Sequence, residues 1–130
     1  MTLHADLDLR RDAFTLSVAF EVADGEVLAV LGPNGSGKST VLSCLAGLLR
    51  PDTASVALAG RTLDDTRTHV APHRRGVGLL AQEPRLFPHL SVLDNVAFGP
   101  RSRGGSRPAA RERARRELGE VDALPLAKRR

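Results

Sequence analysis

The sequence predicts an α/β fold in which buried parallel strands alternate with helices. Two apolar runs, residues 27–31 and 76–81, have the composition of strands that are buried on both faces of a sheet. A glycine-rich turn follows the first run, and the next apolar residues recur at helical spacing from Val41 to Leu49. This order of strand, helix and strand is typical of α/β proteins.

The segments around these runs show further periodicities. Residues 14–22 alternate apolar and polar side chains, which predicts a half-buried strand. The helix after the glycines is expected to end at Arg50 and Pro51, because proline cannot continue it. Residues 55–59 predict another short strand, and the polar residues 61–75 predict a loop or an edge region.

The last third of the chain predicts two further helices. Ser91 is placed as an N-cap with Asp94 three residues on, and this helix is expected to end near Pro100. Residues 101–107 have linker composition. A charged helix is expected to follow, over residues 108–123.

Charge is distributed unevenly along the 130 residues. Residues 1–100 carry nine basic and eleven acidic side chains, whereas residues 101–130 carry ten basic and four acidic ones. We therefore expect a core domain in residues 1–100, followed by a basic linker and the start of a helical part in residues 101–130.

Composition favours a cytoplasmic protein. The chain is 42% hydrophobic and 26% charged, which lies in the range of globular proteins. Cys44 is the only cysteine, which excludes an internal disulfide and fits a reducing compartment. No signal peptide is visible and no apolar run is long enough for a membrane-spanning helix, so we expect neither.

The motif that carries chemistry is Gly32-x-x-x-x-Gly37-Lys38-Ser39, which matches the phosphate-binding P-loop pattern. Glycines let backbone N–H groups approach a triphosphate, and the following helix points its positive end at the anion. Lys38 is expected to bridge the β- and γ-phosphates, Ser39 to ligate Mg²⁺, and Thr40 to lie near the α-phosphate. The predicted nucleotide contacts in this loop are Gly32, Asn34, Gly35, Ser36, Gly37, Lys38, Ser39 and Thr40.

Two longer stretches resemble the nucleotide-binding domains of ABC transporters: "ADGEVLAVLGPNGSGKSTVLSCLAGLLRPD" (23–52) and "RRGVGLLAQEPRLFPHLSVLDNVAFG" (74–99). The resemblance implies an incomplete P-loop NTPase fold with an N-terminal β-subdomain, a P-loop helix and the start of a helical subdomain. It also implies that Gln82 senses the γ-phosphate through Mg²⁺ and the attacking water. A neutral amide at the carboxyl end of a strand also suits ligand binding in an open α/β sheet. We therefore expect ATP and Mg²⁺ as cofactors, with Ser39 and Gln82 as metal ligands.

The stretch "APHRRGVGLLAQEPRLFPHLSV" is most similar to the ATP-binding subunits of bacterial importers for molybdate and related oxyanions. Importers for iron and polyamines have similar stretches, so the transported solute stays open. The resemblance implies a peripheral subunit at the inner face of the cell membrane that binds Mg-ATP to energise solute uptake. The loop after Gln82 is then expected to contact the transmembrane permease subunits, and a second ABC domain is the expected dimer partner of a complete chain.

Three motifs of that family have no match in these 130 residues: the signature L-S-G-G-Q, the catalytic glutamate and the switch histidine. The resemblance therefore indicates a domain truncated before the signature, and we expect nucleotide binding without efficient turnover by these residues alone. The family's adenine-stacking position falls near Leu9 or Arg10. Arg10 is a candidate to stack through its planar guanidinium, whereas Phe14 is expected to pack in its strand.

Three alternative functions stay open. A non-hydrolysing remnant or a regulatory protein would keep the same loop. A small P-loop kinase would need its own acid or base, but the paired carboxylates Asp64 and Asp65 are expected in a solvated turn. A nucleic-acid surface would use the arginines of residues 111–116, but these lie among glutamates without aromatic residues, which favours a solvated helix face.

Overall fold

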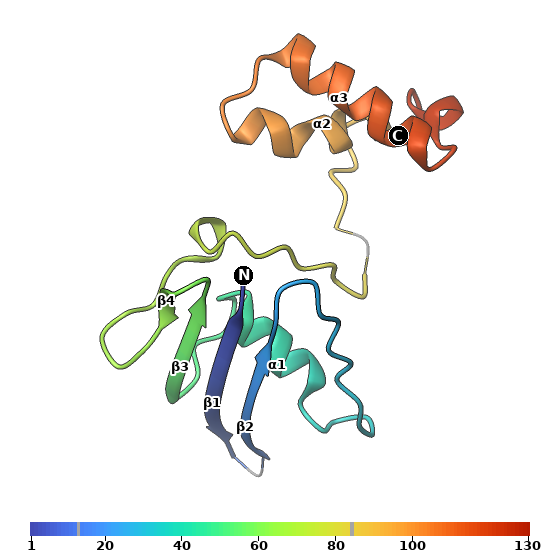
Figure 1. Ribbon diagram of the computed structural model, residues 1–130. Helices are drawn as coiled ribbons and strands as arrows, with labels where there is room; N and C mark the ends of the chain where they lie inside the picture. Colours follow the sequence, from blue (N-terminus) through green and yellow to red (C-terminus); the bar gives the residue numbers. More distant parts are fainter. Residues whose placement is uncertain (13, 84) are drawn as a thin grey trace. The chain divides into compact units, whose positions relative to one another are not determined.

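The computed structural model describes residues 1–12, 14–83 and 85–130 (Figure 1). They form two compact units, Met1–Leu80 and Ala81–Arg130. The division that we expected, after residue 100, falls inside a helix of the second unit.

Among the described residues, four strands form one antiparallel sheet in the first unit. The strands are β1 (Leu3–Arg11), β2 (Phe14–Val22), β3 (Thr53–Leu58) and β4 (Arg61–Asp64). Their order across the sheet is β2-β1-β3-β4, so β1 pairs with both β2 and β3 (Figure 1).

The sheet follows from alternating side chains. In β1, Ala5, Leu7 and Leu9 are buried and the residues between them are exposed. The strand at residues 14–22 is confirmed, whereas β1 was missed, although its residues show the same period of two. The predicted edge region contains β4, which follows β3 through a two-residue turn.

That turn consists of Ala59 and Gly60, whose φ values of 52° and 75° are both left-handed. Left-handed φ at both central positions is the mark of a type I′ hairpin turn, whose twist matches that of the paired strands.

Helix α1 (Lys38–Leu45) lies against the sheet (Figure 1). Its buried residues Val41 and Cys44 join Leu7 and Leu9 in one apolar core. Burial raises the pKa of the Cys44 thiol, which suits a packing role. The predicted helix is thus confirmed and begins at Lys38, but it ends at Leu45, before the expected end at Arg50.

The two apolar runs that predicted buried parallel strands are not strands in the structure. Residues 27–31 and 76–81 are irregular, and the side chains of Val27, Leu31 and Leu80 are 91%, 89% and 97% exposed. A strand buried on both faces needs neighbouring strands and a covering layer, and the described residues provide neither for these runs. The mixture of strands and helices is as predicted, but the parallel sheet is wrong for this part of the chain.

The second unit consists of α2 (Val92–Ser102), α3 (Arg107–Glu120) and the short 3₁₀ helix η2 (Leu124–Leu126). Ser91 is the N-cap of α2, and its hydroxyl accepts a hydrogen bond from the Asp94 N–H at 3.1 Å, as predicted. In the described part of the chain, no helix has the length and apolar character needed to cross a membrane.

Small side chains let α2 and α3 pack closely. Ala97 of α2 is buried against Ala110 and Ala114 of α3, with Leu93 packed beside them. Helix α2 continues through Pro100 instead of ending there. Pro100 has no N–H to donate, so the helix continues there without one backbone hydrogen bond.

An ion pair joins the two helices. The Arg111 guanidinium donates through Nε and Nη2 to the two carboxylate oxygens of Asp94, at 2.8 and 2.9 Å. These hydrogen bonds lower the pKa of Asp94 from 3.8 to about 2. The ionised carboxylate therefore stabilises the folded unit above the ordinary carboxyl pKa, and this contribution is lost as pH falls through about 2.

Asp94→Asn removes the negative charge of this pair. We expect the free energy of unfolding to fall by a constant amount from neutral pH down to about pH 4. Below pH 4, the difference in unfolding free energy between the variant and the wild-type chain shrinks and approaches zero near pH 2. The reason is that the wild-type carboxyl then becomes protonated and is neutral, like the asparagine. Denaturant unfolding followed by circular dichroism at several pH values measures this difference, and a difference that does not change with pH would contradict the assignment.

Candidate phosphate-binding site

The predicted phosphate loop leads into the N-terminus of α1. Ser36 N–H donates to the Pro33 carbonyl at 3.2 Å, and Gly37 is the N-cap residue, with a left-handed φ of 95°. The first bond into the helix runs from Val41 N–H to the Gly37 carbonyl at 2.9 Å. The three N–H groups before it precede the helical hydrogen bonds, and no described side chain caps this end. These groups are donors suited to an anion.

The Lys38 ammonium folds back over this loop. Its Nζ donates to the carbonyl oxygens of Gly32 and Pro33, at 2.8 Å each. Both bonds are exposed to solvent, so a phosphate oxygen can compete for the same three donors of the ammonium. The lysine therefore lies at the loop, where the sequence predicted it.

The glycines are required by their surroundings. A Cβ on Gly37 would lie 2.8 Å from Phe14 Cζ, and a Cβ on Gly32 would lie 2.7 Å from Ser36 Oγ. Gly35 has a left-handed φ of 82° and faces open space. Phe14 packs against the core and the loop, as predicted, and thereby supports the loop from the side of the sheet.

The loop fits a nucleoside triphosphate by its chemistry. It combines free helical N–H groups, one ammonium and a backbone that side chains do not cover; Gly32, Asn34, Gly35 and Ser36 are exposed. Ser39 is exposed on the first turn of α1 and Thr40 is partly buried there. A hydroxyl oxygen at this position is a ligand type that Mg²⁺ prefers beside phosphate.

The other predicted site residues lie elsewhere. Gln82 is exposed at the start of the second unit, so its shared role with Ser39 stays a prediction. Arg10 is exposed near the end of β1, where its backbone N–H donates to Asp52 at 2.6 Å and lowers the pKa of that carboxyl. Its contact with adenine also stays a prediction.

A buried charged cluster at the far end of α1 was missed by sequence reasoning. It consists of Arg75, Asp64 and His69; Arg75 is 1% and Asp64 2% exposed. The expectation that Asp64 and Asp65 lie in a solvated turn is wrong for Asp64, because Arg75 compensates its charge in the interior. The acidic pair Asp64-Asp65 and the arginines Arg74-Arg75 are visible in the sequence, but they lie about ten residues apart and no pattern shows which arginine turns inward.

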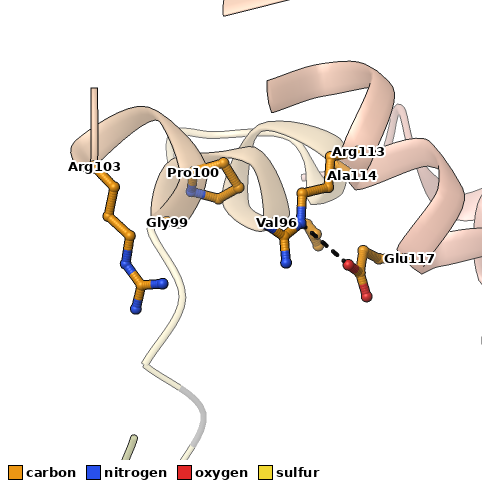
Figure 2. Close-up of a pocket in the computed structure, with 7 residues that line it drawn as sticks. All are labelled: Val96, Gly99, Pro100, Arg103, Arg113, Ala114 and Glu117. Atoms are coloured by element: carbon orange, nitrogen blue, oxygen red, sulfur yellow. Dashed lines mark hydrogen bonds and ion pairs between the residues drawn. The ribbon is translucent and has the colours of Figure 1, made fainter. Parts of the chain in front are cut away.

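The second unit has a groove between α2 and α3 that is lined by charged and small side chains (Figure 2). On its wall Arg113 donates to Glu117 at 3.3 Å. Arg111 is likewise engaged, with Asp94. Arginines already paired with carboxylates, Arg113 within α3 and Arg111 with Asp94 of α2, favour the predicted solvated face over a nucleic-acid surface.

Comparison with known proteins identifies the family. The model of the ABC transporter family matches residues 16–130. The chain belongs to this family. Over 121 residues it is 56% identical to the molybdenum import ATP-binding protein ModC of Mycobacterium tuberculosis, covering 88% of this chain and 33% of that protein. It is 48% identical over 114 residues to the Fe(3+) ions import ATP-binding protein FbpC of Streptomyces avermitilis, covering 88% of this chain and 32% of that protein.

A solved structure supports the same assignment. The structure of cbiO1 from Clostridium perfringens, part of the ABC transporter complex cbiONQ, matches with a TM-score of 0.76 and 26% identity. The match covers 98% of this chain and 53% of that chain. The predicted resemblance and the ABC ATPase type of fold are thus confirmed, and the chain spans about a third of the length of the curated relatives cited here.

Proposed function

We propose that this chain is part of the ATP-binding subunit of an ABC importer and binds Mg-ATP through the loop from Gly32 to Thr40. The observation that carries the proposal is the loop itself: an uncapped helix N-terminus, with the Lys38 ammonium 2.8 Å from the loop carbonyls. ATP would lie with its β- and γ-phosphates against Lys38 and the helix N–H groups. Mg²⁺ would be held by Ser39, and by Gln82 in the bound state.

The test uses the two lysines of the chain, Lys38 and Lys128. Lys38→Met should weaken Mg-ATP binding about 10- to 100-fold, because a hydrogen bond to a charged group contributes about 1.5–3 kcal/mol. Lys128→Met changes the net charge equally but alters an exposed residue of the second unit, and should bind as the wild type does. Isothermal titration calorimetry measures both. Equal affinities of the two variants would overturn the proposed site.

We further propose that the solute is molybdate or a related oxyanion. The similarity to ModC supports this choice, and the 48% identity to FbpC makes iron the competing solute. Deleting the gene should lower the molybdenum content of the cells and leave their iron content unchanged, as measured by elemental mass spectrometry. Loss of iron with unchanged molybdenum would contradict the proposal.

The segment after Gln82 is our proposed contact with the transmembrane subunits. It presents apolar side chains to solvent: Leu86 is 67% and Phe87 39% exposed. Asn95 of α2 braces it, because its side chain accepts from Phe87 N–H at 2.8 Å and donates to Phe87 O at 3.1 Å. An exposed apolar segment whose backbone is fixed by hydrogen bonds is typical of a protein–protein contact.

Site-specific cross-linking tests this contact. Cys44 is buried, so a cysteine introduced at Leu86 would be the reactive thiol of the chain. Leu86→Cys in the assembled transporter should cross-link to a membrane subunit. Thr66→Cys, exposed in the first unit, is the matched control and should not. Equal cross-linking from both positions would contradict the proposed contact.

A further inference from the structure

We propose that Arg75 is a positioning residue for the phosphate loop: it fixes the C-terminal end of α1, whose N-terminal end forms the binding surface. The proposal rests on the nucleotide binding proposed above and adds a residue that lies outside the loop. Arg75 is 1% exposed, although arginine is among the side chains least often buried.

Arg75 binds the carbonyls at the C-terminal end of α1. Arg75 Nη1 donates to the carbonyl oxygens of Cys44 and Leu45, at 3.1 Å each, and Nε donates to the Val70 carbonyl at 2.7 Å. The last carbonyls of a helix have no partner within the helix. A cation at this end also interacts favourably with the helix dipole. Arg75 therefore holds α1 and the strand-like segment at Val70 in one fixed geometry.

Arg75 also compensates the buried charge of Asp64. Arg75 Nη2 donates to Asp64 Oδ2 at 2.6 Å, and His69 Nδ1 lies 2.6 Å from the other oxygen, Oδ1. Two acceptors would repel each other at that separation, so Nδ1 carries the proton and donates to Asp64. The carboxylate belongs to β4, so the guanidinium connects the helix end to the edge of the sheet. A planar fork with several partners sets orientation as well as distance, which a lysine cannot do.

The backbone at the end of α1 is shaped to accommodate the Arg75 side chain. Gly47 is buried with a left-handed φ of 77°, and a Cβ on it would lie 2.7 Å from Arg75 Cζ. Leu48 N–H and Gly47 N–H close this end on the carbonyls of Ser43 and Cys44, at 2.9 and 3.0 Å. The chain thus leaves a space at the end of α1 that the guanidinium fills.

Helix α1 connects the Arg75 contacts at its C-terminal end to the phosphate loop at its N-terminal end. Helix α1 has eight residues, so it is about 12 Å long. A helix this short is not stable by itself and depends on packing contacts. Its fixed points are the buried face at Val41 and Cys44, the Phe14 ring beside the loop and the end held by Arg75. A change at Arg75 should therefore tilt the N–H groups that face the phosphates.

The test compares Arg75→Lys with Arg74→Lys in the 130-residue chain. Both keep the charge, but Arg74 is exposed and serves as the matched control. Arg75→Lys should weaken Mg-ATP binding about tenfold in calorimetry, and the loss should be smaller for AMP, which has fewer phosphates. It should also move the NMR amide resonances of Gly35 and Gly37 in the absence of nucleotide, whereas Arg74→Lys should change none of these quantities.

The outcomes separate the two proposals. If the wild-type chain binds no Mg-ATP but Arg75→Lys still moves the glycine resonances, the coupling stands and the proposed function fails. If Arg75→Lys is folded, with wild-type affinity and wild-type glycine resonances, the positioning role is overturned. Should Arg75→Lys not fold, His69→Ala removes one hydrogen bond from Asp64 at a partly exposed residue and is expected to move the same resonances by less. Unmoved resonances in that variant would overturn the role as well.

Discussion

The first unit depends on one buried guanidinium. Arg75 connects three parts of the first unit: the end of α1, the edge strand β4 and the segment at Val70. Removing one partner of a buried ion pair costs about 3–5 kcal/mol, because the other charge is left uncompensated. A domain is stable by only about 5–15 kcal/mol, so the loss of either partner alone would remove a large share of the stability of the unit.

The two ends of α1 therefore differ in structure and in proposed role. The C-terminal end is closed by backbone hydrogen bonds and by Arg75, with little room for adjustment. The N-terminal end is open, glycine-rich and exposed, and Lys38 is held there by two solvent-exposed bonds to loop carbonyls. A helix that is fixed at one end and unsatisfied at the other can present N–H groups to an anion without refolding. This arrangement favours phosphate binding over a plain turn.

Local structure could be predicted from the sequence, and long-range pairing could not. The loop at Gly32–Ser39, the Ser91 cap and the strand at residues 14–22 depend on neighbouring residues, so their patterns were sufficient. The parallel strands at 27–31 and 76–81 were predicted from apolar composition alone, but strand formation also needs partners that the described residues do not provide. The inward turn of Arg75 depends on residues up to 31 positions away, and no local pattern encodes it.

Native-state hydrogen exchange of the wild-type chain tests the central claim most directly. If Arg75 fixes α1 to the sheet, the amides of α1 from Val41 to Leu45 should open only with the sheet, and exchange with the same free energy as those of Leu7 and Leu9 in β1. If the α1 amides exchange well before those of β1, the helix opens independently of the sheet. The buried guanidinium would then not be the anchor of the phosphate loop.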